Sequence, residues 1–158
     1  MAPTKCRACS VHPRGRGEHA PLTLAHEIGH FLDSAGFMSP GPGVAAASVA
    51  AASPAWQQWR QAIGQSAAVL ALQTAQVTHP AGAVSDYLRY LLDLPEIWAR
   101  AYAQYIAIRS GNAALGRALA AVRSDPDMLH PGVHWTDADF TPIATAIDDL
   151  FKEVGWRR

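Results

Sequence analysis

The interpretation of the chain begins with the stretch Leu24-Ala25-His26-Glu27-Ile28-Gly29-His30-Phe31-Leu32-Asp33. In an α-helix, His26 and His30 lie four residues apart and therefore on the same face, about 6 Å apart along the axis. Two imidazoles in this register can bind one metal ion. Glu27 lies at the edge of that face, where a carboxylate can reach a water molecule beside the metal without itself being a ligand.

This arrangement matches the H-E-x-x-H motif of zinc hydrolases. The motif is short, and the alternative is an amphipathic helix with two surface histidines and one glutamate. Apolar residues flank the polar ones and predict that the helix is buried, which favours the zinc interpretation. These flanking residues are Leu24, Ala25, Ile28, Phe31 and Leu32. Pro21 and Thr23 suit the start of this helix, and Gly36 suits its end.

Length and composition predict one domain, residues 21–158, because 158 residues can form one core but are short for two. Residues 1–20 read as a disordered tail and residues 37–53 as a flexible loop rich in Gly, Pro, Ala and Ser. The net charge is zero and only 16% of residues are charged, so neither nucleic acid nor an acidic membrane is an expected partner. With no long apolar stretch and no secretory signal in the sequence, we expect a cytoplasmic protein.

A second metal site is conceivable near the N-terminus, where four potential zinc ligands occur close together. They are Cys6, Cys9, His12 and His19, the cysteines in a C-x-x-C pair. The segment has almost no apolar residues to surround a metal, and its arginines favour a solvated tail.

The rest of the chain predicts a mainly α fold, α+β at most, with few or no strands. The expected helices run from Pro54, capped by Ser53, through Leu70; from Leu94 to near Ser110; from Asn112 to Ser124; and from Thr136 to Val154. The last has the clearest helical spacing of apolar residues. Only residues 132–136 could pair briefly as a strand.

A catalytic zinc needs three protein ligands, and the two histidines leave one unassigned. The candidates are Asp33, His79, Asp86, Asp93, Glu96, His130 and His134. Glu96 is favoured because it begins a strongly amphipathic helix and adjoins the expected core residues Ile97 and Trp98. The alternative is a capping box formed by Asp93 and Glu96, which would explain both acids without a metal. Asp33 is a further candidate, either as an acceptor for a ligand imidazole N–H or as a surface acid.

Two segments together resemble the signature helices of gluzincin-type metallopeptidases, particularly those of phages and mobile elements and the anthrax-lethal-factor-like peptidases. The segments are residues 25–33, AHEIGHFLD, and residues 90–105, YLLDLPEIWARAYAQY. The resemblance implies a zincin-like helical domain in which the H-E-x-x-H helix faces a second, ligand-bearing helix. It implies that Glu96 is the third zinc ligand and that Tyr90 assists the developing oxyanion.

The chain departs from the pattern of these relatives in one residue and in one structural feature. Gln104 stands where the family has a second acid in the second helix, and the strands that precede the first helix in the relatives, including one that pairs with extended substrate, have no counterpart here.

The functional expectation is a zinc metalloendopeptidase acting on protein or peptide substrates. His26, His30 and Glu96 would bind one Zn²⁺, with Glu27 as general base and Tyr90, or alternatively His79 or His134, near the oxyanion. The alternative is a non-catalytic or truncated zinc-binding helical module from a phage or mobile element.

Overall fold

The computed structural model describes residues 20–37, 45–125 and 133–156, and within these ranges the protein is all-α. The helices are α1 (Ala20–Phe31), α2 (Ala47–Ala50), α3 (Pro54–Gln65), α4 (Ala67–Thr78), α5 (Ala83–Leu91), α6 (Leu94–Arg109), α7 (Ala113–Arg123) and α8 (Asp137–Glu153), and the π-helical turn η1 (Leu32–Gly36) continues α1. No strand occurs in the described ranges, so the expected helical class is confirmed. Residues 133–136 do not form the brief strand considered above.

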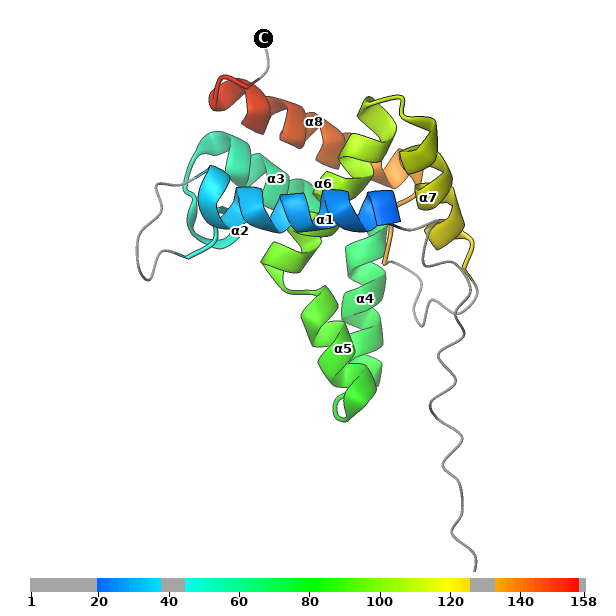
Figure 1. Ribbon diagram of the computed structural model, residues 1–158. Helices are drawn as coiled ribbons and strands as arrows, with labels where there is room; N and C mark the ends of the chain where they lie inside the picture. Colours follow the sequence, from blue (N-terminus) through cyan, green and yellow to red (C-terminus); the bar gives the residue numbers. More distant parts are fainter. Residues whose placement is uncertain (1–19, 38–44, 126–132, 157–158) are drawn as a thin grey trace, which may run out of the picture.

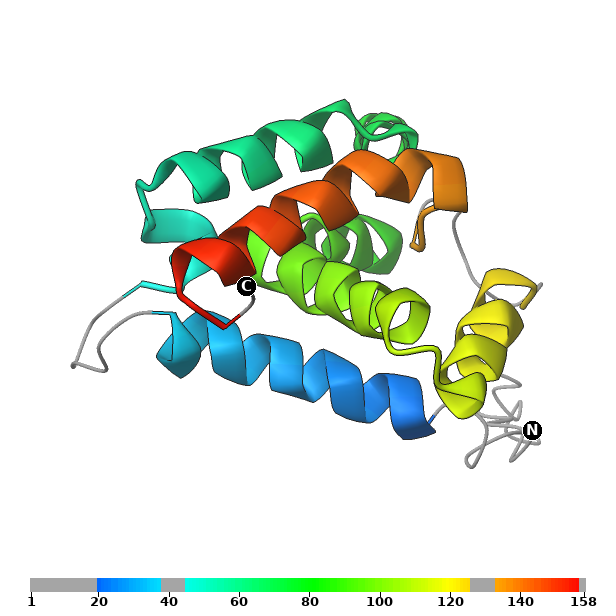
Figure 2. The same cartoon turned by 90° about the horizontal axis from the view of Figure 1, so that it is seen from above.

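Helix α6 lies at the centre of the fold. Figure 1 shows α1 crossing in front of it, and the view from above in Figure 2 shows α6 between α1 on one side and α8 and α3 on the other. Ten of its residues are buried, and they lie on several sides of the helix instead of along a single apolar stripe. Seven of the ten are apolar or aromatic, and the other three are Glu96, Arg100 and Gln104. Pro95 stands in its first turn, where a missing N–H costs nothing.

The main core is aromatic at its centre. Trp56 and Trp59 of α3 meet Trp98 of α6, with ring centroids 4.9 to 5.5 Å apart. The apolar stripe predicted for the last helix packs against them and is fully buried at Phe140, Ile143, Ile147 and Leu150. This confirms that the spacing of apolar residues in α8 marks its core face.

Several predicted helix starts are confirmed by their capping bonds. The Asn112 side chain accepts hydrogen bonds from the N–H groups of Ala114 and Leu115, at 2.9 and 3.2 Å. Thr136 accepts one from the Asp139 N–H at 3.2 Å, and Ser53 accepts one from the Trp56 N–H at 3.4 Å. Each side chain satisfies a donor that the first helical turn leaves free.

The prediction of one helix from Pro54 through Leu70 is wrong beyond Gln65, because the chain divides at Ser66 into α3 and α4. The Ser66 hydroxyl donates to the Ile63 carbonyl at 2.8 Å and accepts from the Val69 N–H at 3.4 Å. Asp139 of α8 then accepts from the N–H groups of Ala67 and Ala68, at 2.8 and 3.0 Å. Asp139, about 70 residues away in the sequence, thus stabilises the start of α4. No local sequence signal reveals this contact with α8.

Helix α1 is buried on one face only, which corrects the expectation that the apolar residues around the motif are buried. Its inner face consists of Leu22, Ala25 and Gly29, whereas Leu24 and Phe31 are 63% and 64% exposed and Ile28 is 41% exposed. Ala25 and Gly29 allow α1 to approach α6 closely, and Leu22 packs at the end of this face, whereas Leu24, Ile28 and Phe31 are exposed. No helix in the described part of the chain is long and apolar enough to cross a membrane.

Part of the segment expected to be a loop, residues 37–53, forms the short helix α2. Asp33 explains its position: this carboxylate is 2% exposed and accepts hydrogen bonds from the Ser48 N–H at 2.6 Å and the Ser48 hydroxyl at 2.7 Å. Burial raises the pKa of Asp33 despite these two bonds. Asp33 therefore connects α2 to η1 and is neither a surface acid nor a bonded partner of a histidine.

Candidate metal centre

The two helices that carry the candidate ligands approach each other unusually closely. A methyl group built on Gly29 of α1 would lie 2.9 Å from the Ala99 Cα of α6. The Trp98 indole N–H donates to the Gly29 carbonyl at 2.9 Å, which fixes the same crossing point. Gly29 lies between the two histidines, so the crossing brings their side chains beside the first turn of α6.

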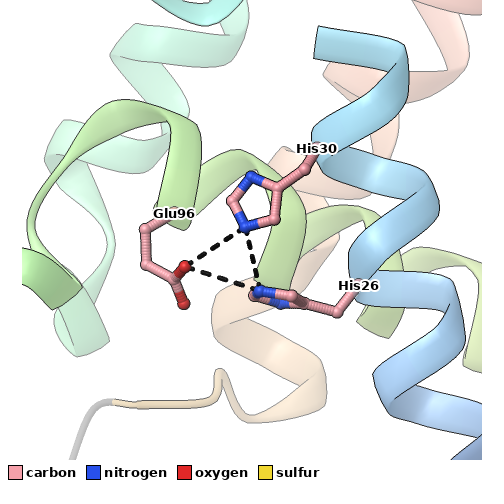
Figure 3. Close-up of side chains that lie close together, drawn as sticks. All are labelled: His26, His30 and Glu96. Atoms are coloured by element: carbon pink, nitrogen blue, oxygen red, sulfur yellow. Dashed lines mark hydrogen bonds and ion pairs between the residues drawn. The ribbon is translucent and has the colours of Figure 1, made fainter. Parts of the chain in front are cut away.

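At this crossing His26, His30 and Glu96 converge, as Figure 3 shows. The two histidine Nε2 atoms are 3.0 Å apart, and the Glu96 Oε2 atom lies 3.5 Å from that of His26 and 3.4 Å from that of His30. Within the described ranges these three form the one group of histidine, cysteine and acidic side chains close enough to hold a metal ion.

The spacing of these three atoms fits a zinc-sized ion. Zinc bonds of about 2.0–2.1 Å to nitrogen or oxygen in a tetrahedron place the ligand atoms about 3.3–3.4 Å from one another. The observed separations of 3.0, 3.4 and 3.5 Å lie close to that value. Two imidazoles and one carboxylate are also a donor set found in catalytic zinc sites, where the fourth position is left to water or substrate. The residues therefore fit the ion that the sequence predicts.

The environment of Glu96 favours its ionised form. Burial opposes ionisation, but the contacts with His26 and Tyr90 and the charge of Arg100 outweigh it and lower the pKa of Glu96. The Tyr90 hydroxyl donates to Glu96 Oε2 at 2.6 Å, and Arg100 Nε lies 3.4 Å from Oε1. One carboxylate oxygen thus faces the histidines and the other faces the guanidinium.

The capping box considered as an alternative role for Glu96 is not formed. Asp93 is the N-cap of α6, but its side chain makes no capping hydrogen bond. Glu96 is 4% exposed and points toward the histidines.

Glu27 and Tyr90 both line the open hollow of about 330 Å³ that also contains His26 and Glu96. Glu27 is exposed and lies outside the group of three. Burial, followed by the hydrogen bond to Glu96, raises the pKa of Tyr90 to about 12. Tyr90 is therefore a protonated donor at neutral pH.

Three polar residues at four-residue spacing, Glu96, Arg100 and Gln104, form a buried stripe along α6. Gln104 is completely buried, and its amide pairs with the backbone of Trp135: Nε2 donates to the carbonyl at 3.1 Å, and Oε1 accepts from the N–H at 3.3 Å. A carboxylate could not donate the first of these bonds. The amide at this position therefore has a structural role that an acid could not fill.

Arg100 of this stripe and Arg123 of α7 together hold the segment that carries His134. Arg100 donates to the Val133 carbonyl at 2.7 Å, and Arg123 donates to the Trp135 carbonyl at 2.6 Å. The backbone is therefore held on both sides of His134, which lines the hollow. Burial, then the charges of Arg100 and Arg123, lower the pKa of His134 to about 4, so its imidazole is neutral at pH 7.

The other candidate ligands lie away from the group of three. His79 is exposed in the turn after α4, Asp86 pairs with Arg89 at 2.9 Å, and Asp93 is exposed. His130 lies outside the described residues, as do the four candidate ligands of the N-terminal site: Cys6, Cys9, His12 and His19.

Sequence reasoning missed Arg100 and Gly29 as parts of the site. Arg100 stands four residues after Glu96 on the same helix, a spacing that pairs opposite charges, and this signal could have identified it. Gly29 had no equivalent signal, because its importance depends on Ala99 of another helix.

Comparisons with protein-family models, with curated proteins and with solved structures find no match to this chain. The functional argument therefore depends on the residues and their geometry.

Proposed function

We propose that this protein is a zinc-dependent metallopeptidase of gluzincin type, with His26, His30 and Glu96 as the zinc ligands. The observation that carries the proposal is the convergence of these side chains at tetrahedral spacing, beside a hollow that Glu27 and Tyr90 also line. Two histidines on one helix could occur together by chance. A buried carboxylate from a second helix at the matching distance is much less expected without a metal.

Each residue has a defined role in the proposed reaction. Bound zinc would act as a Lewis acid that activates a water molecule and polarises the scissile carbonyl. Glu27 takes the proton from the attacking water and passes it to the leaving amine as the C–N bond breaks. The Tyr90 hydroxyl would move its one hydrogen bond from Glu96 Oε2 to the carbonyl oxygen as negative charge develops on that oxygen. Arg100, whose Nε lies 3.4 Å from Glu96 Oε1, adds to the contacts with His26 and Tyr90 that keep Glu96 ionised.

A second proposal is a zinc-binding helical module without catalytic activity. It is favoured by the absence, in the described ranges, of any strand that could pair with an extended substrate. Under this proposal the chain binds zinc but cleaves no peptide in a library.

Replacing Glu27 with Gln tests the catalytic proposal, because the amide cannot accept the proton but keeps nearly the same size. Glu27→Gln should lower cleavage of casein by at least about 100-fold while the zinc content stays unchanged. Glu153→Gln, at the exposed end of α8, is the matched control and should cleave casein at the native rate. A Glu27→Gln protein with native activity would disprove the assignment.

A further inference from the structure

Polar side chains from α1, α5 and α6 and from the segment before α8 make up most of the wall of the hollow beside the candidate ligands. The charged ones are Glu27, Glu96 and Arg100, because the imidazole of His134 is neutral at pH 7. Two carboxylates and one guanidinium give this wall one net negative charge. The double charge of a zinc ion held by neutral imidazoles and Glu96 would reverse the sign. The zinc-loaded hollow would therefore attract an anion.

Arg100 is a buried cation with donors to spare. It is 4% exposed, one terminal nitrogen donates to the Val133 carbonyl at 2.7 Å, and the other donates to the Leu91 carbonyl. A guanidinium carries two N–H groups on each terminal nitrogen and stays charged at neutral pH. Each terminal nitrogen of Arg100 thus keeps one N–H that these bonds do not use, on a residue that lines the hollow.

Glu96 is the acid that balances Arg100. Its Oε1 lies 3.4 Å from Arg100 Nε, whereas its Oε2 faces His26 and His30. A carboxylate that also binds a divalent cation shares its charge with that cation, so it balances the guanidinium less well. Because a buried charge is stable only when it is paired, metal binding makes a second anion beside Arg100 favourable.

Tyr87 supplies a further donor on the same wall. Its ring lies beside that of Tyr90, with centroids 6.5 Å apart, and its hydroxyl has no hydrogen-bond partner in the part of the chain that the structure describes. Burial lowers the pKa of Arg100, and Glu96 and then Tyr87 counteract that effect, so Tyr87 lies near the guanidinium. The Tyr90 hydroxyl is bonded to Glu96, which leaves the Tyr87 hydroxyl available to a ligand.

We propose that Arg100 and Tyr87 bind the C-terminal carboxylate of the peptide substrate, so that the zinc-loaded protein cleaves peptides close to their C-terminal end. The inference rests on the proposed function, because the metal ligands define where the cleaved bond lies. A carboxylate accepts hydrogen bonds from the free N–H groups and gives the buried guanidinium a second counter-charge. A stretch from the interior of a substrate chain has no backbone charge to place there. The inference thus departs from the endopeptidase expected from the sequence in the position of the cleaved bond.

The test uses three probes that carry a hydroxamate at one end of a succinyl group and differ at the other end: alanine, alanine amide and aspartate amide. The first has a C-terminal carboxylate, the second has no carboxylate, and the third has one only on its side chain. Calorimetry measures their binding to the zinc-loaded full-length chain, which requires no turnover. The alanine probe should bind at least about tenfold more tightly than alanine amide, and aspartate amide should gain nothing over alanine amide.

The other outcomes separate this inference from the proposed function. Equal binding of all three probes would overturn the inference and leave the metal site standing. A gain for aspartate amide as large as that for alanine would overturn it too, because the hollow would then accept any carboxylate. No binding of any probe would overturn both the inference and the proposed function.

Two variants locate the bound carboxylate. At saturating zinc, Arg100→Gln should abolish the advantage of the alanine probe over its amide, and Tyr87→Phe should reduce it at least about threefold. The ratio of two probes on the same variant is compared, so a weaker metal site alone does not change the result. Tyr87→Phe leaves the bonds of Arg100 in place and decides the question if Arg100→Gln fails to fold. Arg109→Gln, at an exposed position on the same helix, is the matched control and should keep the full advantage. An advantage of native size in Tyr87→Phe or in folded Arg100→Gln would contradict the assignment.

Discussion

Gly29 and Ala99 are in such close contact that the crossing of α1 and α6 has no space for one more methyl group. A Cβ on Gly29 would lie 2.9 Å from the Ala99 Cα, 3.3 Å from its carbonyl oxygen and 3.3 Å from the Tyr102 Cβ. The nearest of these atoms are backbone atoms, which cannot move aside independently. The distance between the histidines and Glu96 thus depends on a glycine that contributes no ligand atom.

Gly29→Ala should therefore destabilise the protein and separate the ligands. Overpacking of this kind costs about 1–3 kcal/mol, and we expect that loss in the free energy of unfolding, together with weaker zinc binding. Gly64→Ala in α3 is the matched control, because nothing lies within 4 Å of the added methyl. That control should stabilise the protein by up to about 1 kcal/mol through helix propensity. Urea denaturation of both variants measures the difference, and equal stability would contradict the close-packing argument.

Tyr90→Phe tests the hydroxyl that lies 2.6 Å from Glu96. Its loss removes the proposed oxyanion donor, so cleavage should fall by about 100-fold at saturating zinc. The kcat value should carry the loss, with KM nearly unchanged, because the hydroxyl would act on charge that develops only during the reaction. A variant with native kcat would show that Tyr90 has no part in the reaction.

Arg100→Gln should weaken zinc binding although Arg100 is not a ligand. The variant loses the charge that helps to keep Glu96 ionised and both bonds to the carbonyls of Leu91 and Val133. Loss of such a supporting residue typically lowers metal affinity by about 10- to 100-fold, which competition with a zinc chelator would measure. Arg109→Gln on the same helix is the control, since Arg109 is exposed and pairs with Asp148. If both variants bind zinc equally well, Arg100 does not support the site.

His134 should make stability depend on pH in the mildly acidic range. Its pKa in the folded chain is about 4, below the usual value of 6.5, so the unfolded chain binds a proton that the folded chain does not. As the pH falls from 6.5 toward 4, the protein should lose about 1.4 kcal/mol of stability per pH unit from this residue. His134→Gln should remove that contribution, and denaturation at pH 7, 6 and 5 measures it. An unchanged pH slope in the variant would contradict a neutral, buried His134.

Much of the fold follows from local signals in the sequence. The caps at Ser53, Asn112 and Thr136 act on the next few residues, and the apolar spacing in α8 reflects one packed face. His26 and His30 could be paired from their shared helical register. Glu96 was favoured over a capping box only through the resemblance of residues 90–105, because burial on several sides of α6 removes the argument from an amphipathic helix.

What could not be predicted depends on partners distant in the sequence. Asp139 stabilises the start of α4 in addition to the local cap at Ser66, and Asp33 holds α2 through its contacts with Ser48. The exposure of Leu24 and Phe31 follows from α1 contacting its neighbours through small residues, which local apolar patterning does not reveal.

Zinc content measured by elemental analysis of the purified full-length chain is the most direct test of the account. We expect about one zinc ion per native chain and less than about a tenth of an ion in His26→Ala. His79→Ala, a replacement at an exposed histidine outside the group of three, should keep the native zinc content. A native chain with less than about a tenth of an equivalent after purification in zinc-containing buffer would contradict the metal site, and with it the proposed function.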